Sequence, residues 1–141
     1  MKIKLAALIL SAATFNSLAC QSSQNLPGQN IDLFFEKNSS QLSADQILKL
    51  ANWAVDTRLK YSIQDGMSIG GLADANEKES KELAMRRASA AQTLLTQFGF
   101  AKVPYEVRGR IYKPYDPSDP RESGKRVEIE LSPGCPNHCC D

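Results

Sequence analysis

The chain has 141 residues, of which 42% are hydrophobic and 23% charged, which suits one compact domain with one core. Its formal net charge of +1 becomes −1 when residues 1–19, which contain Lys2 and Lys4, are set aside. This balance leaves no excess of positive charge to attract nucleic acid or an anionic membrane surface. We therefore expect no nucleic-acid partner.

The amino terminus predicts export. Residues 1–19 join a positively charged start to an apolar run from Leu5 to Phe15 and end at the small residue Ala19, which is the pattern of a signal peptide. The apolar run is too short for a membrane-spanning helix, which needs about 20 residues. We expect the mature protein to work in the cell envelope, on the periplasmic side.

Cys20 follows the signal directly, and two alternatives stay open for it. Leu18-Ala19-Cys20 resembles the end of a bacterial lipoprotein signal, which implies a lipid on Cys20 and an anchor in the outer membrane. Ser17 and Ala19 equally suit ordinary cleavage, which leaves Cys20 free or disulfide-bonded in a soluble periplasmic protein. Lipidation would leave three cysteines, and therefore an odd thiol.

The first elements follow a tether. Residues 20–30 are polar and carry Pro27 and Gly28, which predicts a flexible linker before a domain over residues 31–131. Apolar residues alternate from Ile31 to Phe35 and predict a first strand.

A helix is predicted next. Ser43 is its expected N-cap, and Gln46 is expected to reach back to the same turn, as in a capping box. Trp53 lies off the apolar stripe, so packing at the sheet margin and stacking on a sugar are both open for it. The residues that recur at helical spacing are Ile47, Leu50, Ala51, Ala54 and Val55.

The central strand runs from Met67 to Asp74, where apolar residues give way to a carboxylate. A second helix is expected to begin at Asn76 as its cap, with Glu77 and Glu79 in the first turn. Gly99 is expected to end it. The predicted buried stripe of this helix is Ala84, Ala88, Ala91, Leu95 and Phe98.

Two adjacent arginines in this helix have different expected environments. At about 100° per residue, Arg87 lies on the flank of the buried stripe and Arg86 on the opposite, solvated face. A third strand is predicted from Tyr105 to Tyr112. A polar, proline-containing loop over residues 113–124 and a last strand from Val127 to Leu131 complete a βαβαββ order.

Four blocks in this order resemble the OmpA-like peptidoglycan-binding domain. Ile31 to Leu42 is similar to the family's opening strand and turn, and Met67 to Asp74 to the strand that ends in Gly-x-x-Asp. Leu83-Ala84-Met85-Arg86-Arg87-Ala88 is similar to the helix signature Leu-Ser-x-x-Arg-Ala, and Gly124 to Ile129 to the closing strand. The resemblance implies an α+β, two-layer sandwich whose small mixed sheet has two helices on one face.

The resemblance also implies a function, which is non-catalytic capture of the diaminopimelate of the peptidoglycan stem peptide. Asp74 would bind the ligand's amino group and Arg87 its carboxylate, a pairing suited to a zwitterion. The alternative is a salt bridge between Asp74 and Arg87 that only ties loop to helix. The implied supporting positions are Leu72, Ala73, Leu83 and Arg126.

Some positions depart from the family pattern. Leu72 and Ala73 stand where the family commonly has His and Thr, and the stretch from Asp74 to Arg87 is about two residues short. These differences keep open a second function, in which the domain is a structural or adaptor module that has lost its ligand.

The last segment, residues 132–141, lies outside the resemblance. Cys135, Cys139 and Cys140 favour disulfides over a metal site with His138, because three such close ligands do not easily close one tetrahedron. We expect no metal and no cofactor. An enzyme is also not expected, since the sole histidine lies in this tail and no serine or cysteine motif stands at a predicted strand end with a base in reach.

Overall fold

The computed structural model describes residues 26–115, 118, 123–136 and 140. The expected signal segment 1–19 and Cys20 lie outside these residues. Within them the predicted βαβαββ order is confirmed. The elements are β1 (Gln29–Phe34), α1 (Ala44–Lys60), β2 (Gln64–Ala73), α2 (Ser80–Leu95), the π-helical turn η1 (Thr96–Phe100), β3 (Tyr105–Ile111) and β4 (Arg126–Pro133).

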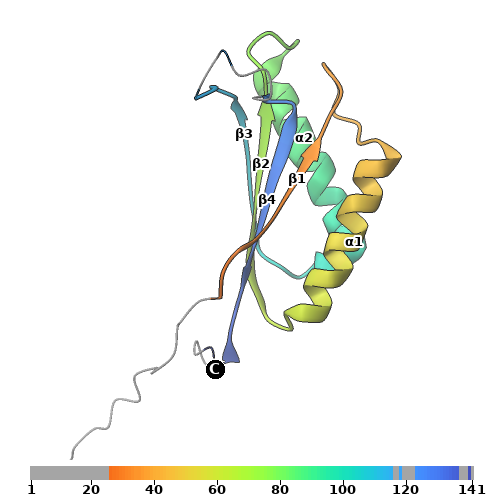
Figure 1. Cartoon of the computed structure of the whole chain (residues 1–141), viewed down its shortest axis with the longest axis vertical. Helices are drawn as coiled ribbons and strands as arrows, with labels where there is room; N and C mark the ends of the chain where they lie inside the picture. Colours follow the sequence, from red (N-terminus) through yellow and green to blue (C-terminus); the bar gives the residue numbers. More distant parts are fainter. Residues whose placement is uncertain (1–25, 116–117, 119–122, 137–139, 141) are drawn as a thin grey trace, which may run out of the picture.

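The strands form one mixed sheet in the order β1-β4-β2-β3. β4 is antiparallel to both β1 and β2, and β3 is parallel to β2. α1 and α2 lie on one face of this sheet (Figure 1). The predicted α+β two-layer sandwich is therefore confirmed. β1 and β4 each run two residues beyond the predicted domain limits, to Gln29 and Pro133.

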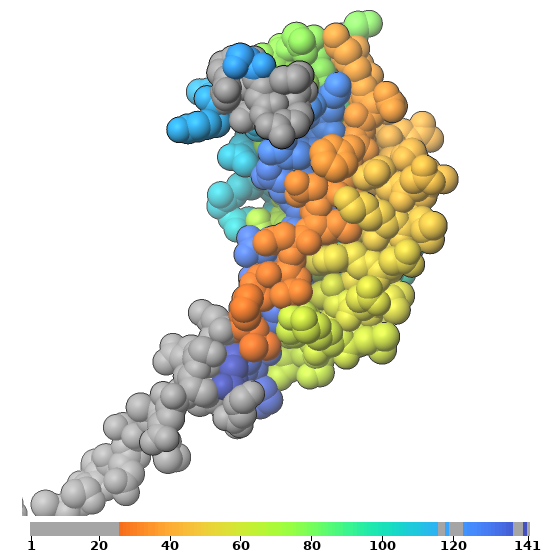
Figure 2. All heavy atoms as spheres, viewed as in Figure 1, coloured from red at the N-terminus to blue at the C-terminus, as the bar shows by residue number. Residues whose placement is uncertain are grey.

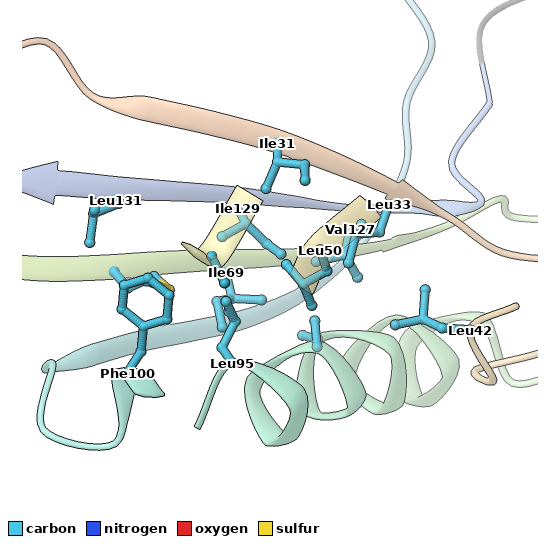
Figure 3. Close-up of a cluster of buried hydrophobic side chains, with 14 of the residues drawn as sticks. Ile31, Leu33, Leu42, Leu50, Ile69, Leu95, Phe100, Val127, Ile129 and Leu131 are labelled. Atoms are coloured by element: carbon cyan, nitrogen blue, oxygen red, sulfur yellow. The ribbon is translucent and has the colours of Figure 1, made fainter. Parts of the chain in front are cut away.

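The core lies between the sheet and the helices (Figure 3). The alternation in the strands turns one set of side chains inward, and α1 and α2 add Leu50 and Leu95. Two predictions about the helices were wrong. Val55 is 54% exposed, and the fully buried phenylalanine is Phe100 rather than Phe98, because the chain leaves the α2 stripe when it enters the turn at η1.

The capping box predicted at the start of α1 is half formed: the Ser43 contact is present, and the Gln46 contact is absent. The Ser43 hydroxyl accepts from the backbone N–H of Gln46. The Gln46 side chain does not reach back; its Oε1 accepts from the N–H of Phe34 at 2.9 Å. Lys49 Nζ likewise donates to the Asp32 carbonyl at 2.7 Å. α1 thus covers the backbone at the outer edge of β1, beside which it runs in Figure 2.

Trp53 is half-buried on α1 and packs against the core, with its ring centroid 6.1 Å from that of Phe100. Of the two alternatives for Trp53, the structure therefore has the packing position at the margin of the sheet. Gly99, which was predicted to end the second helix, lies inside η1 with φ 103°, four residues past the last residue of α2. Arg58 donates from Nη1 to the Phe98 carbonyl at 3.1 Å and so holds α1 to η1.

α2 lies unusually close to the sheet. Gly71 and Gly109 are register partners on β2 and β3, and both face the helix. A Cβ on Gly71 would collide with the Ala84 carbonyl, and one on Gly109 would lie 2.6 Å from the Met85 nitrogen. The two glycines therefore let the helix backbone approach the strands directly.

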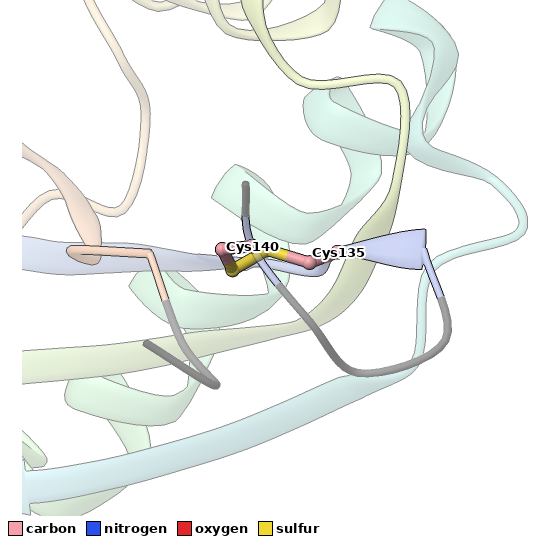
Figure 4. The surroundings of a disulfide bond; sticks show 2 residues. All are labelled: Cys135 and Cys140. Atoms are coloured by element: carbon pink, nitrogen blue, oxygen red, sulfur yellow. A yellow bond between two sulfur atoms is a disulfide. The ribbon is translucent and has the colours of Figure 1, made fainter. Parts of the chain in front are cut away.

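A disulfide follows β4. It joins Cys135 to Cys140, with their Cα atoms 5.0 Å apart (Figure 4). Cys139 and His138, the other residues considered for this tail, lie outside the described residues. In the part of the chain that the structure describes, no helix is long and apolar enough to cross a membrane.

Candidate functional site

Asp74 lies directly after β2, where the apolar alternation ends. Its side chain is half-buried, and Oδ1 accepts from the Gly124 N–H at 2.6 Å. A Cβ at Gly124 would lie 2.8 Å from this oxygen and 3.0 Å from the carbonyl carbon of Ala73. Only glycine therefore brings the chain before β4 close enough to fix the carboxylate.

The two arginines of α2 have the environments that helix periodicity predicts. Arg86 is on the exposed side and pairs with Glu79 at 3.2 Å. Arg87 is fully buried, with 0% of its side chain exposed. The prediction that Arg86 faces solvent while Arg87 lies toward the buried side of the helix is confirmed.

Arg87 does not pair with Asp74. Its partner is Glu77, which accepts from Nη1 at 2.8 Å and from Nη2 at 2.6 Å in a two-pronged contact. The remaining donors bind three carbonyl oxygens, those of Ser39 at 2.8 Å, Leu72 at 2.9 Å and Glu36 at 3.1 Å. All five N–H groups of the guanidinium are thus used within the chain.

Glu77 is the residue that sequence reasoning missed. It was assigned to the first turn of a helix capped by Asn76, but α2 begins at Ser80, after Glu79 at φ 48°. Asp74 and Glu77 close a turn through the Glu77 N–H and the Asp74 carbonyl at 3.0 Å, and the Glu77 side chain points inward. The one sequence signal that pointed to a different conformation here was the stretch from Asp74 to Arg87, which is about two residues shorter than the family pattern.

The Glu77 carboxylate is satisfied on every side. Besides Arg87, it accepts from the N–H of Asn38 at 2.8 Å and from the N–H of Asp74 at 2.9 Å. Burial raises the pKa of Glu77, but the hydrogen bonds from Arg87, Asn38 and Asp74 outweigh burial and hold that pKa below its usual value. The Glu77 carboxylate is therefore negatively charged, and its charge is balanced by the positive charge of Arg87.

The buried pair joins two loops. Arg87 holds the β1–α1 loop through its contacts with Glu36 and Ser39, and the Asn38 side chain accepts from the Lys78 N–H at 2.8 Å in the β2–α2 loop. Asn38 adopts φ 58° to do so, a conformation that asparagine tolerates better than most residues. The salt bridge considered between Asp74 and Arg87 is therefore absent, and Glu77 in place of Asp74 supplies the carboxylate that ties the loop to the helix.

Comparison with known proteins gives a fold but no sequence family. No protein-family model and no curated protein matches the sequence. The structure matches the OmpA-like domain of FopA1 from Francisella tularensis with a TM-score of 0.59 at 20% identity, over 76% of this chain and 73% of that one. It matches the cell wall anchor of the type VI secretion system from Pseudomonas aeruginosa with a TM-score of 0.57 at 16% identity, over 75% and 82%.

A third match is the peptidoglycan-associated lipoprotein from Burkholderia pseudomallei, with a TM-score of 0.52 at 16% identity over 71% of this chain and 88% of that one. The chain has the fold of OmpA-like domains. The resemblance of the four sequence blocks is thereby confirmed at the level of structure.

The predicted supporting positions divide into two kinds. Leu72, Ala73 and Leu83 are buried, and they shape the site through packing and through the Leu72 carbonyl. Arg126 is partly exposed and stacks on the Tyr112 ring, with Cζ 4.8 Å from the ring centroid. Its Nε and Nη2 both bind Glu128 Oε1, at 3.0 and 2.7 Å.

Proposed function

We propose that this OmpA-like domain binds cell-wall peptidoglycan without catalysis, through the diaminopimelate of the stem peptide, and so links the envelope to the wall. The observation that carries the proposal is the half-buried Asp74 carboxylate at the end of β2, held by Gly124. A fixed carboxylate at a loop cluster is suited to binding an ammonium group through charge-assisted hydrogen bonds.

The carboxylate of the ligand has no free donor on Arg87 to bind. Arg87 is the expected partner of that carboxylate. Its guanidinium does not contact Asp74 directly, because the Glu77 carboxylate lies between them and binds both the Arg87 guanidinium and the Asp74 backbone N–H. Binding a ligand carboxylate to Arg87 requires Glu77 to leave. Asp74 is therefore the primary ligand group of the proposal, and Arg87 a contact that depends on displacement of Glu77.

A second candidate function follows from the same contacts. Because all five donors of Arg87 are already used, the domain is also suited to be a structural or adaptor module that keeps the fold without the ligand. In either function we place the protein in the cell envelope on the periplasmic side, soluble or attached to the outer membrane through a lipid on Cys20.

Sedimentation with purified sacculi tests the proposal. The mature protein is expected to pellet with the wall, and Asp74→Asn to stay in solution. Asn keeps an oxygen for the Gly124 N–H, so the fold is retained while the charge is lost. Arg86→Leu, which removes an exposed charge on the same helix, is expected to pellet as wild type does. If Asp74→Asn pellets as wild type does, Asp74 is not the ligand group, and if neither protein pellets, the adaptor function is favoured.

A further inference from the structure

We infer that Glu77 acts as an internal ligand for Arg87, so that the site recognises the amino group of the stem peptide and not the carboxylate beside it. The inference rests on the proposed function and deepens it, because it names the chemical class that the site selects. The ligand is any stem peptide that ends in a primary ammonium group, whether or not a carboxylate accompanies it.

The geometry of Glu77 is that of a bound carboxylate. Its two oxygens face the two terminal nitrogens of Arg87 at 2.8 and 2.6 Å, the fork-to-fork arrangement by which arginine binds free carboxylates. Two backbone N–H groups, from Asn38 and Asp74, complete its shell. A ligand carboxylate would find no unused donor on a guanidinium that is 0% exposed.

Displacing Glu77 is unfavourable. The leaving carboxylate would abandon four hydrogen bonds at once, and the incoming one would have to restore all of them from a flexible peptide in solution. Glu77 is covalently held in the adjacent loop, so its effective concentration at Arg87 exceeds that of any dissolved competitor. Exchange of one carboxylate for another therefore brings the ligand no net gain.

The second basic candidate is engaged as well. Arg126 uses Nε and Nη2 on Glu128, and Nη1 on the Ser123 carbonyl. In contrast, no ion pair to Asp74 occurs among residues 26–115, 118, 123–136 and 140. The charge that the site offers to a ligand is therefore negative, and it selects an ammonium group.

This changes the specificity implied by the family resemblance. A site that reads both ends of diaminopimelate would reject lysine, which lacks the second carboxylate. A site that reads only the ammonium group accepts diaminopimelate, its amidated form and lysine alike. Glu77 is thus a specificity-determining residue for the domain.

The test is competition between sacculi and soluble stem peptides for the mature wild-type protein. Peptides that end in diaminopimelate, amidated diaminopimelate or lysine are expected to release it with midpoints within about twofold of one another. An advantage of about tenfold or more for free diaminopimelate, equivalent to about 1.4 kcal/mol, would overturn the inference. Absence of any sedimentation would instead remove the proposed function.

A second measurement decides the role of Glu77 without the wall. Glu77→Ala leaves a guanidinium that lacks its carboxylate, so acetate is expected to raise the melting temperature of this variant more than chloride of the same ionic strength does. Wild type and Glu82→Ala, an exposed acid of the same region, are expected to respond equally to both salts. If acetate has no specific effect on Glu77→Ala, Glu77 does not fill a carboxylate site and the inference is wrong.

The same variant links both measurements. When sedimentation is observed, Glu77→Ala is expected to prefer diaminopimelate over lysine by about tenfold, because Arg87 is then open to the ligand. If Glu77→Ala does not fold, Glu77→Ser serves in its place, since its short side chain also leaves the guanidinium open, whereas a glutamine amide would still fill the site.

Discussion

Replacing Arg87 with leucine should destabilise the domain far more than the same change at Arg86. Leucine leaves the Glu77 carboxylate buried with two backbone donors and no counter-charge, and it removes the donors from three carbonyls. Removing one partner of a buried ion pair costs about 3–5 kcal/mol. The Arg86 pair is exposed, 49% for Arg86 and 71% for Glu79, so Arg86→Leu should cost no more than about 0.5 kcal/mol.

Urea denaturation at pH 7, followed by far-ultraviolet circular dichroism, gives both free energies of unfolding. A thermal scan should show Arg87→Leu melting more than about 10 °C below wild type, given the size of the domain. The double variant Glu77→Met/Arg87→Met should recover part of the loss, because no charge then remains buried. If Arg87→Leu lies within about 1 kcal/mol of Arg86→Leu, the buried pair does not hold the loops together.

Three further predictions concern acid, packing and the amino terminus. The pKa of Glu77 in the folded state is below its usual value. The ionised carboxylate therefore contributes its full stabilisation above the ordinary carboxyl pKa, and this contribution disappears as the pH falls through the folded pKa. Urea midpoints from pH 7 to pH 3 should consequently fall less steeply in Glu77→Gln than in wild type. Gly71→Ala should cost about 1–3 kcal/mol in urea unfolding through its collision with α2, whereas Gly70→Ala, whose Cβ meets nothing nearer than 3.9 Å, should change stability little. Mass spectrometry of the mature amino terminus should find either a diacylglyceryl adduct on Cys20 or an unmodified residue, and each result eliminates the other alternative.

Local sequence rules predicted what depends on local geometry. Helix periodicity separated Arg86 from Arg87 without knowledge of their partners, and the Ser43 cap follows from chemistry within one helical turn. These properties are set by residues close in the sequence, so a single chain is enough to read them.

The buried pair could not be predicted in the same way. An acid near a helix start normally favours the first turn, and that rule placed Glu77 in α2. The position of Glu77 in the structure depends on its contact with Asn38 and on Arg87. Arg87 is in turn held by carbonyls of the β1–α1 loop, one of them 51 residues away in the sequence. The Gln46 side chain was misassigned for the same reason, since the backbone of β1 outweighed the local capping box. Contacts across the fold decide such competitions, and periodicity does not contain them.

The contacts of α1 with the edge of β1 have a consequence for self-association. An exposed strand edge can add a strand from a second molecule, and proteins that leave such edges open tend to aggregate. Here Gln46 and Lys49 occupy the Phe34 N–H and the Asp32 carbonyl, so the edge is protected only while α1 is docked. A partly folded chain that has formed its sheet before α1 packs would present this edge together with the exposed ring of Phe34. Docking of α1 thus protects this edge of β1 from pairing with a strand of a second molecule.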